Sequence, residues 1–395
     1  MIKVCHIITQ LELGGAQQNT LFTVGHLDRS QFLPILITGV EGLLIEEANR
    51  YTDVQKYYLP ELIREIRPVQ DLSAIFQLRR ILRQERRKDP HMPFIVHTHS
   101  SKAGIVGRWA AQLAGIPVVL HSIHGFGFHP YQSLLVRWSY LLLEWITARI
   151  TTHFIAVSAA NITTGLRYRL FTEDRVSLIR SGIDLLRFHQ YASLTHSEGQ
   201  AHRTQMLKKL HLPDNTPIIG MVACFKPQKA PLDFIRVMNI VVKRHPHVHA
   251  VMVGDGVLRP QIEALIAEYH LEESITLTGW RTDIPALLPL CDMLVLTSYW
   301  EGLPRVCPQA MAAGLPIVAT NVDGIPEAVQ DGSNGFLLQP GDIQGLADKI
   351  VYLLAHPDIA QQMGNNGHER VAEFDIHRMV RQQEELYRSL IAHSQ

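Results

Sequence analysis

Short apolar segments that alternate with longer amphipathic ones constrain the fold of this chain more than any other feature. In the first half, short runs rich in Val and Ile occupy residues 2–8, 33–39, 94–99, 116–122 and 153–158. Helical patterns separate them, most clearly at residues 16–27 and 69–87. This order predicts a parallel sheet with crossover helices. The apolar runs alternate little with polar residues, which is typical of strands buried on both faces.

The second half repeats the pattern after a polar interruption. Residues 189–216 are rich in polar residues, Gly and Pro, and they predict a linker with one short helical patch. The apolar runs then resume at residues 218–224, 249–256, 274–279, 292–298 and 316–320. Because 395 residues exceed one ordinary core, we expect two doubly wound α/β domains in tandem.

These features define the expected domain boundaries. We predict an N-terminal α/β domain over residues 1–188, the linker over 189–216 and a second α/β domain over 217–374. The amphipathic segment 375–395 predicts a closing helix that can pack back on the first domain. Ligands of such sheets bind at the carboxyl ends of the strands. Two facing sheets therefore predict a ligand-binding cleft between the domains.

The balance of charge excludes one class of protein and leaves another open. The chain carries 37 basic and 37 acidic residues, which argues against a nucleic-acid binder that depends on counterion release. Residues 1–190 nevertheless hold 21 Lys and Arg against 15 Asp and Glu, and the remainder is acidic by the same margin. An uneven solvated surface explains this asymmetry, and so does an anionic partner of the first half.

The cysteines and the N-terminus indicate a reducing compartment. The four cysteines include no Cys-x-x-Cys pair, so neither a structural zinc site nor a redox motif is expected. The apolar run at residues 2–8 is too short for a signal peptide and is interpreted as the first strand. We therefore expect a cytoplasmic protein.

Residues 131–150 form the most apolar segment of the chain. Arg137 and Glu144 interrupt it, so a transmembrane helix is not expected. A buried crossover helix is one interpretation. The other is an interfacial helix with Trp138 and Trp145 at the level of lipid headgroups. The basic run at residues 79–88 is either a solvated helix face or a second membrane contact.

The segment EGLPRVCPQAMAAGLPIVAT, residues 301–320, carries the strongest chemical signal. Its prolines predict a helix that begins within 304–308, because Pro is favoured in a first helical turn. The free N–H groups of that turn can bind an anion, and Gly302 lets a ligand approach the backbone closely. Glu301 precedes the helix and can accept hydrogen bonds from hydroxyls, and Gln309 lies inside the helix. A helix cap followed by a core helix is the purely structural interpretation.

Further loops follow other predicted strands. Lys226 and Lys229 lie in FKPQKAP, where they can bind phosphate or remain solvated. The glycines of GDGVLRP, residues 254–260, suit a tight turn with positive φ, either a nucleotide loop or a plain turn. In LTGWRTDIPALL, Trp280 and Arg281 can border a base.

A glycine pair follows the first predicted strand. Gly14 and Gly15 in LGGAQ open a helix and offer backbone N–H groups to an anion. The chain has neither the G-x-G-x-x-G pattern nor a GKS or GKT phosphate loop. A Rossmann dinucleotide site is therefore disfavoured.

These motifs in this order resemble the retaining glycosyltransferases of the GT-B fold, family four. The resemblance runs from LGGAQ to GSNGFLLQPGD, most of the chain. The segment VHTHSSKAGIVGRWAAQLAGIPVVLHSIHGFGFH is similar to capsular and exopolysaccharide members. The resemblance implies two Rossmann-like domains, with the acceptor on the first and the nucleotide sugar on the second.

The resemblance also implies a chemistry. It is that of a retaining hexosyltransferase, which moves a sugar from a UDP- or GDP-linked donor to a saccharide or lipid-linked saccharide. The resemblance also implies a role in cell-surface polysaccharide or glycolipid synthesis. It implies that the reaction needs no cofactor and no metal. A peripheral contact of the basic first domain with the inner face of the cell membrane is expected.

Residue roles follow from the same resemblance. Glu301 and His124 contact the donor sugar, and Lys229 matches the lysine that faces the diphosphate. Gln309 replaces a second Glu that holds the ribose hydroxyls, so we expect a weaker contact there. Cys224 replaces an Arg, and Lys226 can supply the missing cation. The remaining expected donor contacts come from the loop after Glu301, namely Gly302, Leu303, Pro304 and Arg305.

Two other functions are compatible with the same predicted pocket. The first is a nucleotide-sugar epimerase on the same architecture, which needs acid–base residues beside the sugar. The second is a non-enzymatic subunit that binds a nucleotide sugar, for which Gln309 and Cys224 are the best support. Turnover separates both from a transferase.

Overall fold

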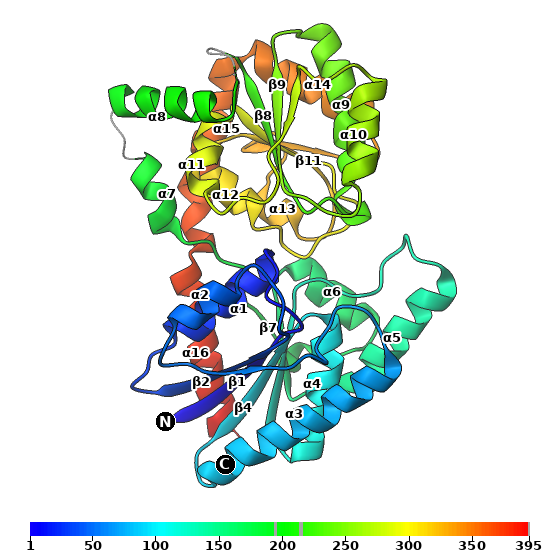
Figure 1. Cartoon of the computed structure of the whole chain (residues 1–395), viewed down its shortest axis with the longest axis vertical. Coiled ribbons are helices and arrows are strands. Elements are labelled where there is room, and N and C mark those ends of the chain that lie inside the picture. Colours follow the sequence, from blue (N-terminus) through cyan, green and yellow to red (C-terminus); the bar gives the residue numbers. More distant parts are fainter. Residues whose placement is uncertain (193–195, 213–215, 394–395) are drawn as a thin grey trace. The chain divides into compact units, whose positions relative to one another are not determined.

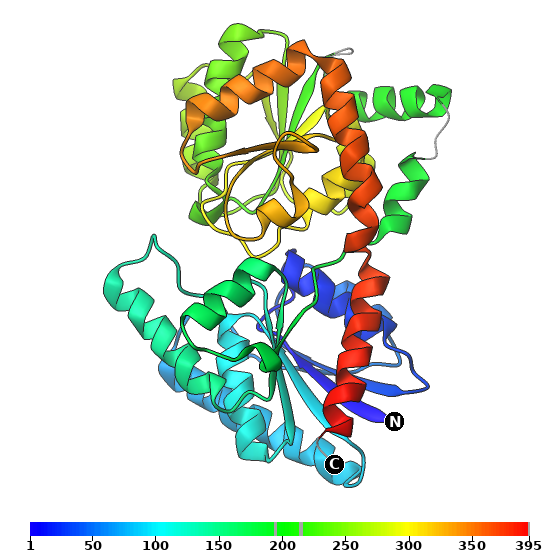
Figure 2. The same cartoon turned by 180° about the vertical axis from the view of Figure 1, so that it is seen from behind.

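The computed structural model describes residues 1–192, 196–212 and 216–393 and divides into two compact units. Unit 1 comprises Met1–Ser181 and Ile376–Gln395, and unit 2 comprises Gly182–Asp375. Each unit is a parallel sheet covered by helices, as Figures 1 and 2 show from opposite sides. The predicted fold class, two Rossmann-like α/β units, is confirmed.

Unit 1 is built on a seven-stranded parallel sheet with the strand order β3-β2-β1-β4-β5-β6-β7. Its strands are β1 Ile2–Ile7, β2 Phe32–Thr38, β3 Gln55–Tyr58, β4 Phe94–His99, β5 Val118–Ile123, β6 His153–Ala156 and β7 Val176–Leu178. The order reverses between β1 and β4, which pair in register from Lys3↔Phe94 onward. At such a reversal the loops after the two strands diverge and leave room for a ligand.

Helices cover both faces of this sheet. They are α1 Gly15–His26, α2 Ile45–Arg50, α3 Pro68–Lys88, α4 Ser101–Ala114, α5 Leu134–Ala148, α6 Ala159–Arg167, η1 Glu173–Arg175 and α16 Ile376–Ala392. Apolar residues of α3 and α4 share one core cluster with β1, β2 and β4. On the other face α16 inserts the fully buried Tyr387 beside Val4 and Phe32. The C-terminal helix thus completes the core of unit 1.

Unit 2 is built on a six-stranded parallel sheet with the order β10-β9-β8-β11-β12-β13. Its strands are β8 Ile218–Val222, β9 His249–Val253, β10 Ile275–Leu277, β11 Met293–Leu296, β12 Ile317–Thr320 and β13 Gly335–Leu338. Its longer helices are α7 Leu185–Ala192, α8 His196–Lys209, α9 Pro231–Arg244, α10 Arg259–Glu268, α14 Ile343–Ala355 and α15 Pro357–Arg370. The short ones are η2 Pro227–Lys229, α11 Ile284–Leu287, η3 Leu288–Leu290, α12 Val306–Ala312, α13 Ile325–Ala328 and η4 Val371–Phe374.

Every apolar run that predicts a strand forms one, and the missed strands share one property. The missed strands β3, β7 and β13 all lie at the edges of their sheets. Their side chains are mostly only partly buried, so they lack the continuous apolar run of a central strand. Edge position, which depends on the assembled sheet, explains why the sequence pattern misses them.

The predicted linker needs a correction. Residues 189–216 include the end of α7 and all of α8, where the sequence predicts one short helical patch. Residues 193–195 and 213–215 lie outside the described residues. The segment belongs to unit 2, in which His202 Nε2 donates to the carbonyl of Ala286 at 2.8 Å. Helix α8 is largely polar, so its apolar periodicity is weak.

Candidate active site

Unit 2 brings Lys229 and Glu301 together at the carboxyl ends of two neighbouring strands. Lys229 ends the turn η2 after β8, and Glu301 lies in the loop after β11. Lys229 Nζ lies 2.5 Å from Glu301 Oε1. The side chain of Glu301 is 4% exposed and that of Lys229 is 23% exposed, so the pair opens to solvent on the lysine side. The two residues that the sequence singles out separately therefore form one ion pair.

Short hydrogen bonds hold the Glu301 carboxylate in place. Ser298 Oγ donates to Glu301 Oε1 at 2.7 Å, the same oxygen that Lys229 reaches. The Glu301 backbone N–H donates to Asp323 Oδ2 at 2.6 Å. Burial raises the pKa of Asp323, and the N–H of Glu301 opposes that rise. Ser298 lies three residues before Glu301 in the same loop and carries no motif of its own, and Asp323 reaches Glu301 only because the assembled sheet brings the loops after β11 and β12 together.

The loops after β8 and β11 are also joined through backbone groups. The Tyr299 N–H donates to the Gln228 carbonyl at 2.8 Å, and Gln228 Nε2 donates to the Trp300 carbonyl at 2.9 Å. Thr297 Oγ1 donates to the carbonyls of Lys229 and Ala230 at 3.1 and 2.9 Å. These contacts fix the path of the backbone on both sides of the Lys229–Glu301 pair.

The predicted helix start after Glu301 is confirmed. Helix α12 begins at Val306, two residues after Pro304. Gly302, Leu303 and Pro304 are buried in the preceding loop, and Arg305 Nε donates to the Gly182 carbonyl at 2.8 Å. Gln309 is half-buried within α12, and its N–H donates to the Arg305 carbonyl. These residues belong to the same loop and helix as Glu301.

The remaining predicted contacts of unit 2 lie in the loops after β8 and β10. Cys224 and Lys226 are half-buried and follow β8. Trp280 and Arg281 follow the edge strand β10, with Trp280 42% exposed. Arg281 makes a two-pronged pair with Asp283, at 2.9 and 2.5 Å. Although burial raises the pKa of Asp283, the Arg281 bonds lower it overall, so this arginine is committed to a neighbour.

The glycine turn after β9 has the predicted backbone. Gly254 has φ +133°, and a Cβ there would lie 1.9 Å from the Ala223 carbonyl oxygen. The turn thus packs directly on the loop after β8. Arg259 and Asp255 pair across it at 3.0 Å. The turn therefore supports the position of the β8 loop.

In unit 1 the predicted glycines open a helix as expected. Helix α1 begins at Gly15, and Gly14 before it has an extended backbone with φ −154°. Gly14, at the N-cap position, has no side chain that could cap the first turn. Gly15 is exposed, and the first N–H groups of a helix have no partner within the helix.

His124 follows β5 and is a neutral ring near neutral pH. Its Nε2 lies 3.3 Å from His99 Nδ1. Burial lowers the pKa of His124 to about 4. The ring therefore acts as a neutral hydrogen-bonding group rather than as a cation.

A small polar cavity lies against His124. Its volume is about 10 Å³, enough for one water. Neither side-chain polar atom of Asn19, nor the hydroxyl of Thr23, has a hydrogen-bond partner among the described residues. The cavity is lined by these two residues of α1 and, among others, by His99, Ser122, His124 and Gln383. A bound water would satisfy polar groups that burial otherwise leaves unpaired.

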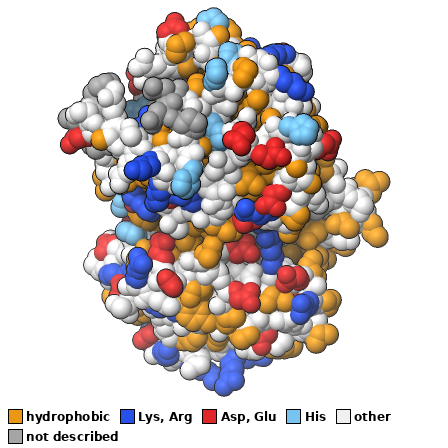
Figure 3. Space-filling model, turned by 45° about the horizontal axis from the view of Figure 1, so that its top comes forward, with side chains coloured by type: hydrophobic (Ala, Val, Ile, Leu, Met, Phe, Trp, Pro, Cys, Tyr) orange, Lys and Arg blue, Asp and Glu red, His pale blue; other side chains and the backbone are white. Residues whose placement is uncertain are grey.

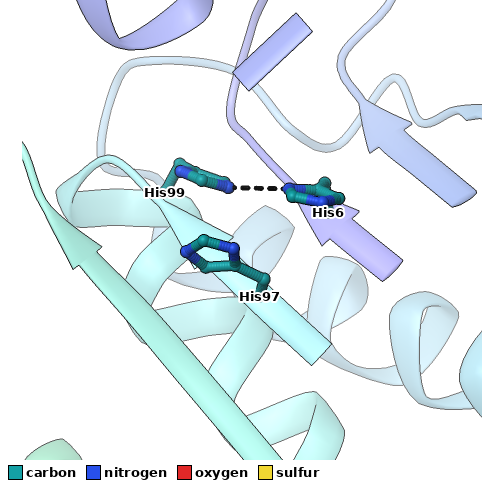
Figure 4. A group of neighbouring side chains, drawn as sticks. All are labelled: His6, His97 and His99. Carbon is teal, nitrogen blue, oxygen red and sulfur yellow. Dashed lines mark hydrogen bonds between the residues drawn. The ribbon is translucent and has the colours of Figure 1, made fainter. Parts of the chain in front are cut away.

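Three buried histidines form a cluster that shares His99 with this cavity. One ring nitrogen each of His6, His97 and His99 lies within 4.8 Å of the other two, and the His6–His99 hydrogen bond, 3.0 Å long, is drawn in Figure 4. Burial lowers the pKa of His6 to about 3 and those of the other two well below the ordinary value. Neutral imidazoles are suitable metal ligands.

Existing hydrogen bonds compete with a metal in this cluster. His97 Nδ1 lies 2.7 Å from the Tyr387 hydroxyl, and its Nε2 lies 2.8 Å from Ser122 Oγ. A metal would have to displace these partners. His6 cannot be identified from a local pattern, because its pairing with His97 across β1 and β4 depends on strand order. Metal independence stays a prediction.

The fold and the site correspond to a known class of protein. The structure of HepE from Anabaena in complex with UDP and glucose superimposes with a TM-score of 0.82 at 21% identity, covering 98% of this chain and 100% of that one. This likeness defines the GT-B fold. A family model described as "Glycosyltransferase Family 4" matches residues 13–187, and one described as "Glycosyl transferases group 1" matches residues 202–370.

Sequence relatives then give the family. UDP-Gal:alpha-D-GlcNAc-diphosphoundecaprenol alpha-1,3-galactosyltransferase of Escherichia coli is 30% identical over 393 residues, 99% of this chain and 97% of that protein. The capsular polysaccharide biosynthesis glycosyltransferase CapM of Staphylococcus aureus is 23% identical over 93% of each chain. The chain belongs to the family-four glycosyltransferases of the GT-B fold. It is an enzyme that uses a nucleotide sugar.

Proposed function

We propose that this enzyme is a retaining hexosyltransferase that extends a lipid-linked saccharide in cell-surface polysaccharide or glycolipid synthesis. The name of the E. coli relative states a UDP-linked donor and a diphosphoundecaprenol-linked acceptor. CapM acts in capsule synthesis, and HepE structures contain UDP or UDP-glucose. UDP is therefore the first nucleotide to test. The expected location is the inner face of the cell membrane.

The Lys229–Glu301 ion pair is the observation that carries the proposal. Lys229 is the more exposed partner, so a diphosphate can approach its ammonium group while Glu301 stays in place. A fixed cation stabilises the charge that develops on the leaving diphosphate. Both Ser298 and Lys229 reach Oε1 of Glu301, and Oε2 then accepts a hydroxyl hydrogen of the donor sugar.

Further donor contacts are proposed around this pair. The backbone of Gly302, Leu303 and Arg305 faces the phosphates, with Pro304 fixing the turn, and Lys226 adds a second cation. Gln309 bonds the ribose as a neutral amide. Trp280 borders the base, and Arg281 positions the loop through its pair with Asp283. Gly14 and Gly15 bind the phosphates or the acceptor through the uncapped start of α1.

The proposed mechanism needs no protein nucleophile. The bond between the anomeric carbon and the diphosphate oxygen breaks, and the acceptor hydroxyl oxygen bonds to that carbon on the same face. The hydroxyl proton passes to the leaving phosphate oxygen. The anomeric configuration is thereby retained. His124, neutral because its pKa is about 4, orients the sugar through a hydrogen bond.

Thermal unfolding with UDP, GDP and ADP, each with and without a chelator, tests the donor site. A ligand of the folded state at a hundredfold excess over its dissociation constant stabilises by ~2.7 kcal/mol. We expect a chelator-resistant shift with UDP that Lys229→Met diminishes. Lys243→Met changes an exposed lysine of α9 and is the matched control. No shift with any nucleotide, or a shift that the chelator removes, contradicts the proposal.

The rival interpretation as a non-enzymatic nucleotide-sugar-binding subunit is disfavoured by membership of a family of transferases. Its support was the neutral Gln309 and the Cys224 substitution, which both remove a charged contact to the donor. It predicts the same thermal shift without turnover. An epimerase would instead change the nucleotide sugar in the absence of any acceptor.

A further inference from the structure

Helix α5 exposes its apolar face to solvent and buries a polar one. Its buried residues are Leu141, Glu144, Thr147 and Ala148. The outward residues are large and apolar, 40 to 80% exposed, and comprise Leu134, Leu135, Val136, Trp138, Leu142, Leu143, Trp145 and Ile146. A surface helix ordinarily buries its apolar stripe and exposes its polar one. The interpretation of this segment as a buried crossover helix is therefore wrong.

A buried ion pair fixes this orientation. Arg108 of α4 is fully buried, and its Nη2 donates to Glu144 Oε2 at 2.8 Å. The same guanidinium donates to Thr151 Oγ1 and to the Gly104 carbonyl, at 3.2 and 2.8 Å. Rotating α5 to bury its leucines would expose Glu144 and leave the Arg108 charge buried without its partner, which is costly. The apolar face is thus held outward by the fold.

Helix α3 extends this surface with positive charge. The exposed face of α3 begins with Val69, Leu72 and Phe76 and continues with Arg80, Arg83 and Arg87. Helices α3, α4 and α5 lie side by side, as Figures 1 and 2 show, and α4 packs on both neighbours. In Figure 3 hydrophobic side chains gather on the projection at the right-hand edge, where α5 begins.

The acidic residues of the two helices do not offset these cations. Asp71 pairs with Lys102 at 2.5 Å, and Glu85 pairs with Lys88 at 2.5 Å. Glu144, the single acid of α5, is the buried partner of Arg108. The outward surface is therefore apolar and basic, which is complementary to an anionic surface with an apolar interior.

We propose that this surface, the outward residues of α5 with Phe76, Arg80, Arg83 and Arg87 of α3, docks on an anionic phospholipid bilayer. The leucines of α5 enter the headgroup and acyl boundary, and Trp138 and Trp145 lie at headgroup level. The guanidinium groups of α3 bind lipid phosphates. A second copy on this surface would bring further arginines and no unpaired acid from α3 or α5 to meet them, which favours lipid as the occupant.

Docking through this surface deepens the proposed function, which places the enzyme at the inner face of the membrane, but its test requires no donor or turnover. The test is cosedimentation of the full chain with phosphatidylcholine vesicles, with or without about one third phosphatidylglycerol. We expect binding to the anionic vesicles that high salt weakens, and a blue shift of tryptophan fluorescence on binding. The Leu135→Ser, Trp138→Ser double variant should lower the bound fraction about tenfold or more.

Matched control variants distinguish binding through this surface from nonspecific binding of the protein to vesicles. Leu186→Ser changes a leucine of α7 that is 69% exposed, against 80% for Leu135, and should bind as the wild type does. Arg80→Glu with Arg87→Glu should weaken binding, whereas Arg378→Glu, on α16 of the same unit, should weaken it far less. Absent wild-type binding, or equal losses in the control variants, overturns the proposal. So does a dimer that forms through α5 and excludes vesicles.

Discussion

Helix α5 of unit 1 and helix α14 of unit 2 have similarly apolar sequences, yet α14 buries its apolar face and α5 exposes most of its own. Helix α14 buries Leu346, Ala347, Ile350 and Leu353. Helix α5 buries Glu144 and Thr147 with Leu141 and Ala148, and it exposes its other leucines and both tryptophans. Apolar content alone therefore does not tell which face of a helix is buried. One buried charge pair decides it in α5.

The strand ends of the two units differ in a related way. In unit 2 they hold the charged pair Lys229–Glu301, open on the lysine side. In unit 1 they hold neutral histidines, with the pKa of His6 lowered to about 3 and that of His124 to about 4. The contrast suits a diphosphate on unit 2 and an uncharged sugar or acceptor hydroxyl on unit 1.

The largest effect is expected from a variant that removes the Glu301 carboxylate from the charged pair of unit 2. Glu301→Ala should lower turnover about 10³-fold or more, because Lys229 and the donor sugar lose their shared partner. The variant should keep its fold, as judged by circular dichroism and thermal unfolding. Glu268→Ala, an exposed glutamate of α10, is the control. Wild-type turnover in Glu301→Ala would remove Glu301 from the site.

The second prediction tests what orients α5. Glu144→Ala leaves Arg108 buried and unpaired and should destabilise unit 1 by about 3–5 kcal/mol in urea unfolding. The double variant Arg108→Met, Glu144→Met should recover most of that loss, since no charge stays buried. If the single and double variants were equally destabilised, the ion pair would not be what orients the helix.

The third prediction concerns how the stability of each unit depends on pH. A buried histidine with a lowered folded pKa is neutral in the native state, whereas the unfolded chain takes up a proton below about pH 6.5. The stability of unit 1 is thus fully present above that pH and is lost as the pH falls toward 4, by about 1.4 kcal/mol per pH unit for each such histidine.

Unit 2 should resist acid better. Partial desolvation raises the folded pKa of Asp292 and of Asp323, although both side chains are exposed, so these carboxyls bind protons in the native state slightly before the unfolded chain does. This proton uptake stabilises unit 2 as the pH falls. It opposes the loss of stability caused by His249, because burial lowers the pKa of that histidine. Hydrogen exchange, resolved by unit between about pH 7 and 5, is the measurement. Equal protection of both units at every pH would refute this contrast, and His6→Asn should flatten the response of unit 1.

The smallest expected effect concerns the ribose contact. Gln309→Glu would replace a neutral hydrogen bond with a charge-assisted one and should tighten UDP binding a few-fold. Titration calorimetry measures the dissociation constant, with Gln309→Ala as the weakening counterpart. Weaker binding by the glutamate variant would mean that Gln309 does not face the ribose.

The sequence predicts the central strands and the helix after Glu301 because burial on two faces and proline placement leave local patterns. It cannot predict that Lys229 and Glu301 form a pair, since their contact depends on β8 and β11 being neighbours. The cluster of His6 with His97 and His99 depends in the same way on strand order. The orientation of α5, with its apolar face outward, depends on Arg108, a residue of another helix.

Transfer itself is the most direct test. The wild-type enzyme would be incubated with UDP-hexoses and a saccharide on diphosphoundecaprenol in anionic vesicles, and the product linkage read by NMR. We predict a new glycosidic bond with the anomeric configuration of the donor, formed in the presence of a chelator and lost in Glu301→Ala. Nucleotide binding without transfer from any UDP- or GDP-linked sugar, or a product of inverted configuration, would contradict a retaining transferase.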